Sequence, residues 1–435
     1  MSLNTLLTAV FILIATGPPR LLRSGELDTA LRPDIVYSGD YLIQIIAWAL
    51  AGFAVCLSVM HRVSKHGLRF PGNLVHGPTK WYLLYGVLAV ISATYSAAPT
   101  YTLFFASKLI ISLLLVSFLL ERGRPEVSGM RLVKVFGYVY VGGFLALVGM
   151  YLVDPLLVGM DRGVYRLSGG PLGGFGVEAL VTGVFALVYL RYYSRSKVGR
   201  FLAMILYAVT WVFVLMSLTR QTILIAALAL VLIGVMGRLS AKRVSVMMFA
   251  VVGFTLVMIF DFGGSAVLSI LDHATRGMSG LETLTGRTVV AAYLVPVWQE
   301  APIFGHGFAS GSRLALLDFA DKTGLGIGSA HSSLWKALVE VGIVGAGFMM
   351  VALVLAWYQT IRLSLLRAAS RDVEVLSKLA LVVMVYATFS VFLNDGFAEG
   401  KLVFVLFIII ISSLMHRFGL EGVGEKQVGQ GLRKS

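Results

Sequence analysis

Apolar residues dominate this chain in runs long enough to cross a bilayer. The hydrocarbon core is about 30 Å thick and takes about 20 apolar residues of helix, with a range of about 17–25. On this template the sequence predicts twelve spanning helices and therefore an all-α polytopic membrane protein, with residues 1–435 as a single integral membrane domain. The predicted spans are 3–16, 41–60, 80–98, 101–120, 132–153, 172–190, 201–219, 221–237, 244–262, 333–358, 376–393 and 401–416.

The first apolar run, residues 3–16, is also short enough for a signal peptide. No Lys or Arg precedes it, and the sequence that follows, Ala15-Thr16-Gly17-Pro18-Pro19, is a poor small-x-small cleavage site. We therefore expect residues 3–16 to be retained as a helix.

Composition supports the membrane assignment. Of 435 residues, 58% are hydrophobic and 13% charged, whereas soluble domains are about 45–50% apolar and about 25% charged. A soluble protein of this composition would expose large apolar patches and aggregate. The single cysteine, Cys56, excludes a disulfide framework and a cysteine-based metal site.

The basic residues record the orientation of the chain. The formal net charge is +14, from 36 Lys and Arg against 22 Asp and Glu. Cytoplasmic loops carry an excess of Lys and Arg, so the base-rich side is cytoplasmic, and so are both termini and the tail 418–435. The charge is thus a topology signal and predicts no nucleic-acid partner. Twenty-three of the bases fall in alternate loops and the tail: Arg62, Lys65, Arg69, Lys80, Arg122, Arg124, Arg131, Lys134, Arg191, Arg195, Lys197, Arg200, Arg238, Lys242, Arg243, Arg362, Arg367, Arg371, Lys378, Arg417, Lys426, Arg433 and Lys434.

The longest outer loop, residues 263–332, separates the ninth and tenth predicted spans. Long loops in compact proteins are usually functional. Residues 288–295 are predicted to form a short amphipathic helix that ends before Pro296. The glycine-rich stretches 305–307 and 324–328 are expected to be flexible.

Four polar residues from distant parts of the chain are placed by this topology on the outer face. Arg220 lies at a hairpin, Arg287 in the long loop, His331 where that loop re-enters the membrane, and Asp395 between the last two spans. A guanidinium group binds phosphate oxygens bidentately. An arginine at the position of Arg220 is also suited to anchoring the hairpin at the membrane surface. An imidazole with a pKa near 6.5 is suited to general-base work. The carboxylate is a turn residue or an orienting group for the imidazole or a sugar hydroxyl.

Taken together, the four residues favour transfer from a phosphorylated, membrane-bound leaving group. No nucleotide supply exists outside the cytoplasm, so the donor must carry its own activation, as a polyprenyl-diphosphate sugar does. No cluster has metal-ligand spacing, and no phosphate-binding Gly-x4-Gly-Lys is present. Lys108 and Glu178 lie within spans and are functional residues, a structural pair or side chains that point into a wet cavity. Ser332 or Ser333 is expected to cap the next helix.

Three motifs resemble those of a known superfamily. Arg220-Gln221-Thr222-Ile223-Leu224 is similar to an Arg-x3-Leu motif, and Thr285-Gly286-Arg287 with the later Pro302–Gly307 is similar to a long-loop signature. His331-Ser332 is followed after nine residues by Gly342-Ile343-Val344-Gly345, similar to a His-Ser/Asn/Gln-x9-Gly-x-x-Gly pattern. The chain thus resembles the O-antigen ligase and Wzy-type polymerase superfamily of bacterial envelope glycosyltransferases.

The resemblance implies a GT-C-like fold and a metal-independent, inverting glycosyl transfer without a cofactor, on the periplasmic face of the inner membrane. It implies that Arg220 and Arg287 bind the diphosphate of an undecaprenyl-diphosphate-linked glycan and that His331 deprotonates the acceptor hydroxyl or orients it. Asp395 would support the site, with Gln221 and His306 as secondary contacts.

The acceptor is left open. A ligase passes the glycan to lipid A-core, whereas an O-antigen or exopolysaccharide polymerase passes it to a second lipid-linked glycan. The glycine spacing after His331 favours the ligase slightly. A twelve-span transporter or flippase is the rival from another class. It predicts polar or broken helices at the midplane and repeat symmetry, whereas the charged candidates here lie at the outer ends of the spans.

Overall fold

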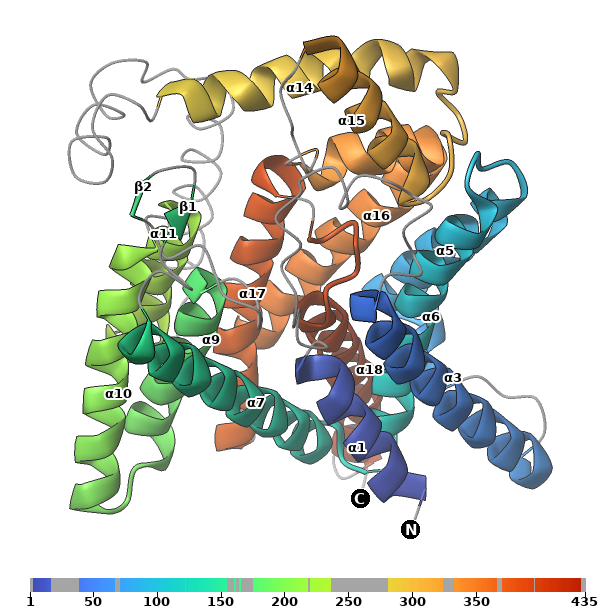
Figure 1. Cartoon of the computed structure of the whole chain (residues 1–435). Coiled ribbons are helices and arrows are strands. Elements are labelled where there is room, and N and C mark those ends of the chain that lie inside the picture. Colours follow the sequence, from blue (N-terminus) through green and yellow to red (C-terminus); the bar gives the residue numbers. More distant parts are fainter. Residues whose placement is uncertain are drawn as a thin grey trace.

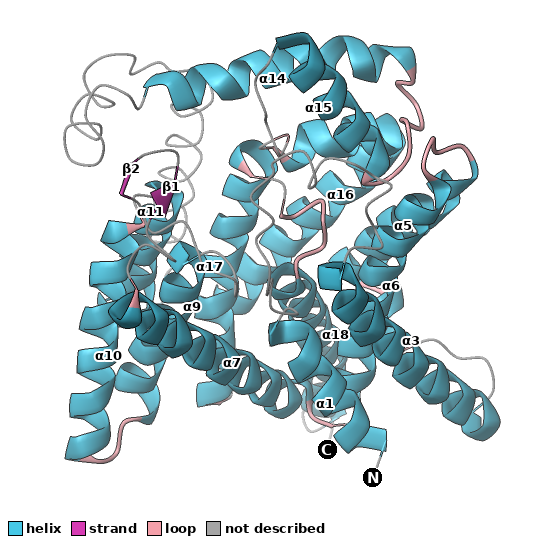
Figure 2. Ribbon diagram, in the orientation of Figure 1, coloured by secondary structure: helices cyan, strands magenta, loops and turns pink. Residues whose placement is uncertain are grey.

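The computed structural model describes the larger part of the chain. The described residues are 3–16, 39–66, 71–121, 123–154, 160–161, 164–165, 175–217, 220–235, 281–323, 330, 332–365, 370–394 and 396–431. Figure 2 shows that these residues are almost entirely helical, as the apolar runs predict.

The first half of the chain forms antiparallel helices and one very short hairpin. The hairpin pairs β1 (Met160–Asp161) with β2 (Val164–Tyr165) in antiparallel register. The helices are α1 (Leu3–Thr16), α3 (Gly39–His66), α4 (Gly72–Val75), α5 (Gly77–Ile91), the 3₁₀ turn η2 (Ser92–Thr94), α6 (Pro99–Glu121) and α7 (Pro125–Val153). They are followed by α9 (Phe175–Val188) with its π-helical end η3 (Tyr189–Tyr193), α10 (Lys197–Met216), and α11 (Arg220–Ala229) with its π-helical end η4 (Leu230–Val235).

The second half contributes the helices that surround the candidate site. They are α14 (Leu281–Glu300), α15 (Ser310–Thr323), α16 (Ser333–Leu365), α17 (Arg371–Leu393) and α18 (Leu402–Gly431). The expected tail after residue 418 continues α18 as helix to Gly431. The predicted span 3–16 is helical as α1, and its retention in the mature protein stays a prediction.

Several helices are suited to a bilayer, which makes this a multi-pass membrane protein. Six of the described helices are long and apolar enough to cross: they contain residues 45–65, 99–121, 125–153, 197–216, 333–365 and 371–392. Shorter apolar helices cover 222–233 and 402–418. Eleven of the twelve predicted spans fall on described helices, and 244–262 lies outside the described residues. The count of twelve crossings stays a prediction.

The buried fraction of each helix distinguishes central helices from peripheral ones. Along its most apolar window α17 is 83% buried, whereas α7 and α10 are each 22% buried. A helix that is hydrophobic all round belongs inside a large bundle, and α17 accordingly packs against α16, α18, α7 and α11. In Figure 1, α16, α17 and α18 form the centre, α3, α5 and α6 lie on one side, and α9, α10 and α11 on the other.

The two ends of the bundle differ. Helices α14 and α15 form a layer across one end, and the start of α1 and the far end of α18 lie at the other (Figure 1). At the end opposite α14 and α15, ion pairs tie the helices together. Arg417 pairs with Glu126 across α18 and α7, and Lys378 Nζ lies 3.3 Å from Glu374 Oε1 within α17. The Tyr193 hydroxyl donates to Asp372 Oδ1 at 2.7 Å and joins η3 to α17.

The long loop is more helical than its sequence predicts. The expected helix 288–295 begins earlier and does not stop before Pro296, because α14 runs from Leu281 to Glu300 with that proline inside it. A proline inside a helix costs about 3 kcal/mol, and packing offsets the cost here. Val290 and Leu294 are buried against Leu316 of α15, a helix that no sequence pattern predicted.

Candidate functional site

A break in α16 marks the centre of the candidate site. Gly342 has φ 64° and ψ −170°, so α16 consists of two helical pieces on either side of it. A Cβ at this position would lie 2.2 Å from the carbonyl oxygen of Ile303. Both the backbone conformation and the close approach require glycine. The first glycine of the Gly-x-x-Gly pattern therefore has a structural explanation.

The glycine-rich segment 302–307 fills this break. Ile343 N donates to Pro302 O at 2.9 Å, and Gly307 N donates to Glu340 O at 2.8 Å. Gly305, with φ 70°, lies so close to the same turn that a Cβ would be 2.5 Å from the carbonyl carbon of Glu340. Two motifs separated in the sequence thus form one hydrogen-bonded unit. We call residues 302–307, which bind to the broken turn of α16, the 302–307 latch.

His306 belongs to this latch. Its backbone N donates to Val339 O at 2.8 Å, and its Nε2 lies 2.8 Å from Val297 O. The side chain expected to be a secondary polar contact thus links α14 to the broken turn of α16.

The start of α16 is joined to the segment between α17 and α18. Ser332 caps the helix, since its Oγ accepts from Trp335 N at 3.3 Å, as expected, and it donates to Val391 O at 2.9 Å. Ser333 Oγ donates to Asn394 O at 2.8 Å and accepts from Phe397 N at 3.2 Å. His331 and Asp395 lie outside the described residues. Ser333, two residues after His331, is hydrogen-bonded to Asn394, which directly precedes Asp395.

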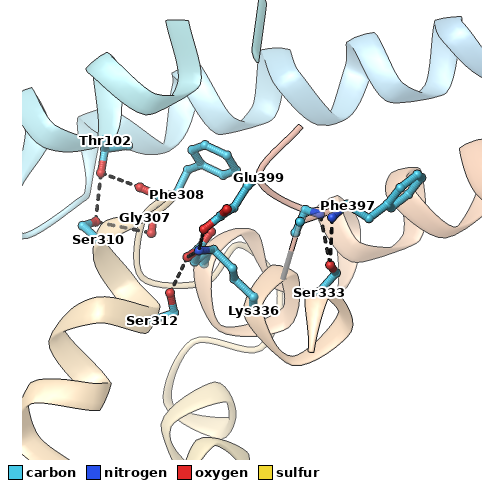
Figure 3. A network of polar contacts seen from close by, with 12 residues as sticks. Thr102, Gly307, Phe308, Ser310, Ser312, Ser333, Lys336, Phe397 and Glu399 are labelled. Atoms are coloured by element: carbon cyan, nitrogen blue, oxygen red, sulfur yellow. Dashed lines mark hydrogen bonds and ion pairs between the residues drawn. The ribbon is translucent and has the colours of Figure 1, made fainter. Parts of the chain in front are cut away.

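The first turns of α16 carry a network of charged side chains, two of them buried, drawn in Figure 3. Lys336 Nζ is 2.9 Å from Glu399 Oε1 and 3.7 Å from Glu340 Oε1. The side chains of Lys336 and Glu340 are 8% and 0% exposed, and that of Glu399 is 39% exposed. Ser312 of α15 donates to Glu340 Oε1. We call Ser312, Lys336, Glu340 and Glu399 the charged network; it connects α15, α16 and the 394–401 segment.

The sequence reasoning missed this network, although a signal was present. Lys336 and Glu340 stand four residues apart inside a predicted span, and ionisable residues within membrane helices are functional hypotheses by default. Glu399 gives no comparable signal, because its role appears only when the 394–401 segment folds back on α16.

A hydroxyl cluster fixes α15 to α6. Ser310 Oγ lies 2.7 Å from Ser96 Oγ and 2.8 Å from Thr102 Oγ1, and Thr102 Oγ1 donates to Phe308 O at 2.9 Å. All of these hydroxyl groups are buried, and buried polar groups are stable only when hydrogen-bonded. The cluster thereby holds the outer layer in place over the bundle.

A cavity of about 810 Å³ opens between α7, α9, α17 and the start of α18. Its lining is mostly apolar and aromatic, with Lys134, Glu178 and Lys401 as its charged residues. Glu178 Oε2 is buried without a hydrogen-bond partner among the described residues. Lys401 approaches Gly396, where a Cβ would lie 2.7 Å from its Cδ. The cavity therefore begins at the 394–401 segment.

Lys108 is separate from Glu178. Its Nζ lies 4.9 Å from the ring centroid of Phe105 and 5.3 Å from that of Trp48. Since Glu178 faces the cavity instead, no ion pair joins the two among the described residues.

The predicted arginines fall on helices at the same end of the molecule. Arg220 and Gln221 are the first two residues of α11, and Arg287 lies in α14. Figure 1 places the start of α11, α14 and the start of α16 at that end. The side chains of these three residues lie outside what the structure describes, so their role stays a prediction.

Comparison with protein families decides the identity of this region. Residues 202–350, about a third of the chain, match the family described as O-antigen ligase. This segment is similar to the O-antigen ligase family. The match contains Arg220, Arg287, the 302–307 latch and Gly342, and the superfamily recognised from the sequence is confirmed. Among curated proteins, none matches the chain.

The described helices make this a multi-pass membrane protein. The match over residues 202–350 supports a role in envelope polysaccharide assembly. The break in α16 resembles the broken helices of transporters, but backbone of the long loop fills the gap.

Proposed function

We propose that this protein transfers a glycan from undecaprenyl diphosphate to an acceptor sugar hydroxyl. The observation that carries the proposal is the meeting of the latch, the start of α16 and the 394–401 segment in one set of hydrogen bonds and ion pairs. These contacts lie under α14 and α15, at the end opposite the start of α1 (Figure 1). Because the base-rich loops are cytoplasmic by the positive-inside rule, the proposed active site is periplasmic in a bacterial inner membrane, with residues 263–332 as the periplasmic loop.

The proposed chemistry is an inverting displacement. The acceptor oxygen attacks the anomeric carbon, the bond from that carbon to the diphosphate oxygen breaks, and the electron pair leaves with the diphosphate. Arg220 and Arg287 hold the diphosphate, because charge-assisted guanidinium contacts stabilise the negative charge that develops there. His331 accepts the proton of the acceptor hydroxyl, and Asp395 orients His331 or the hydroxyl. Gln221 is a secondary contact, and neither a metal ion nor a cofactor is required.

The cavity between α7, α9 and α17 supports a lipid-linked donor. Its lining on α7 extends from Met130 to Ala146, which is about 24 Å of helix at a rise of 1.5 Å per residue. An isoprenoid chain has no polar groups to satisfy and matches such a lining. Lys401 at the cavity's polar end adds positive charge near the place where a diphosphate would lie.

The acceptor separates two forms of this function. We favour ligation to lipid A-core, on the glycine spacing after His331, with an O-antigen or exopolysaccharide polymerase as the alternative. A deletion strain examined on a polysaccharide gel distinguishes them. Uncapped lipid A-core with long lipid-linked chains supports a ligase, single repeats on lipid A-core support an O-antigen polymerase, and loss of secreted polymer supports an exopolysaccharide enzyme.

The transfer itself is tested with purified protein. We expect conversion of lipid-linked glycan and acceptor to product in EDTA without added nucleotide, and we expect His331→Ala to abolish it while the protein stays folded. Loss of activity on chelation would contradict the arginine-based mechanism. Wild-type turnover by His331→Ala would remove the base assignment.

A further inference from the structure

The charged network is an unusual feature for the interior of a membrane bundle. Lys336 is 8% exposed and Glu340 is fully buried. Burying an ion pair is costly, and well-packed apolar residues often serve stability equally well or better. The network therefore needs an explanation other than stability.

The connections of the network supply that explanation. Glu340 accepts from Ser312, so it links α16 to the first turn of α15 in the long loop. Lys336 binds Glu399, so it links α16 to the segment between α17 and α18. The backbone carbonyl of Glu340 also accepts from Gly307 in the latch. One turn of α16 thus contacts α15, the latch and the 394–401 segment (Figure 3).

Members of the charged network lie close in the sequence to the predicted reacting residues. Lys336 follows His331 by five residues, and Glu399 follows Asp395 by four. Ser333 Oγ is hydrogen-bonded to backbone atoms of Asn394 and Phe397. The Lys336–Glu399 ion pair adds a contact between two side chains to these bonds.

We propose that Lys336, Glu340 and Glu399 are positioning residues that fix the segment around Asp395 relative to the turn that follows His331. This inference rests on the proposed function for its catalytic consequence. Displacing a reacting group by about 1 Å can cost about 100-fold in rate, so the network sets turnover through geometry and touches no substrate.

The experiment compares single and double variants of Lys336 and Glu340. Lys336→Met alone leaves Glu340 buried without its cation and lowers thermal stability. The double variant Lys336→Met/Glu340→Gln buries no charge, so its thermal stability returns toward that of the wild type. We expect its kcat to stay about 10- to 100-fold low, with the KM for lipid-linked donor within about threefold. Recovery of kcat together with stability would overturn the proposal.

Glu399 offers a conservative rescue. Glu399→Gln keeps an oxygen that accepts from Lys336 Nζ, so we expect kcat near that of the wild type, whereas Glu399→Ala is expected to behave like the double variant. The matched control is Lys378→Met, which removes a 3% exposed lysine from its pair with Glu374 at the opposite end of the molecule. It is expected to lower thermal stability and leave kcat within about twofold. An equal fall in kcat in this control would overturn the positioning role.

A second measurement is independent of activity. Hydrogen–deuterium exchange of a peptide covering residues 394–404 reports the amides of Phe397 and Ala398, which donate to Ser333 Oγ at 3.2 Å. We expect faster exchange in the double variant and unchanged exchange in Lys378→Met. Unchanged exchange in the double variant would refute the proposal even if the wild type performs no transfer, whereas a wild type without transfer but with the expected exchange would refute only the proposed function.

Discussion

Replacing Gly342 with alanine tests whether the break in α16 is required by the latch. Gly342 has φ 64° and ψ −170°, a region of backbone space that is essentially restricted to glycine. An alanine there costs about 1–3 kcal/mol in backbone strain. Its Cβ would also lie 2.2 Å from Ile303 O and 2.3 Å from Ile303 C. These are backbone atoms, so the latch itself has to move.

Movement of the latch adds a second cost. The bonds from Ile343 N to Pro302 O and from Gly307 N to Glu340 O contribute about 0.5–1.5 kcal/mol each. Together with the strain, the free energy of unfolding is expected to fall by about 2–6 kcal/mol. The latch also borders the candidate site, so transfer activity is expected to fall with it.

Equilibrium unfolding in mixed micelles measures this difference, and the same helix provides a matched control. Gly347 lies five residues further along α16, and a Cβ there meets nothing within 4 Å. Gly347→Ala is expected to be neutral or to stabilise by up to about 1 kcal/mol, since alanine is the better helix former. Equal unfolding free energies for the two variants would refute the reasoning.

Three further predictions concern other parts of the molecule. Tyr85→Phe removes the hydroxyl that donates to Ala398 O at 3.0 Å and leaves that buried carbonyl unsatisfied. The free energy of unfolding should therefore fall by about 1–3 kcal/mol. The control is Tyr358→Phe at a tyrosine that is 59% exposed, which should change the free energy of unfolding by less than about 0.5 kcal/mol. Arg220→Lys keeps the charge but loses the bidentate fork, so kcat/KM for lipid-linked donor should fall at least about tenfold, and an unchanged value would remove Arg220 from the diphosphate site. Hydrogen bonds from Lys322 and Tyr293 hold the pKa of Asp318 below its ordinary value of 3.8. The hydrogen bond from Tyr293 in α14 to the Asp318 carboxylate in α15 is therefore complete above pH 3.8 and is weakened as the pH falls through the lowered pKa. Hydrogen exchange of α15, corrected for intrinsic rates, should therefore be constant from pH 5 to pH 8, and a loss of protection within that window would contradict this assignment.

The sequence predicts the helices well because apolar length and charge alternation are local properties. The runs at 101–120 and 376–393 correspond to α6 and α17 within a few residues. The break at Gly342 could not be predicted in the same way. It depends on the approach of Ile303 from a segment about 40 residues earlier, and the flanking residues have the apolar pattern of an uninterrupted helix.

The contacts of the candidate site also divide into those that local sequence predicts and those that depend on the fold. The capping role of Ser332 was predictable, because a serine before an apolar run is a common N-cap, and the cap is observed. The partnership of Lys336 with Glu399 was not, since 63 residues separate them. The Gly-x-x-Gly pattern pointed to the correct turn, but only the fold shows that its first glycine admits the backbone of Ile303.

The latch also limits how this protein can be recombined with its relatives. Residues 302–307 and 339–344 exchange backbone hydrogen bonds in both directions, so neither segment has its polar groups satisfied without the other. A chimaera that receives a foreign outer loop but keeps its own α16 would bring together two surfaces that were selected separately. Transplanting the outer loop between related proteins therefore requires that the loop and the first turns of α16 be moved as one unit.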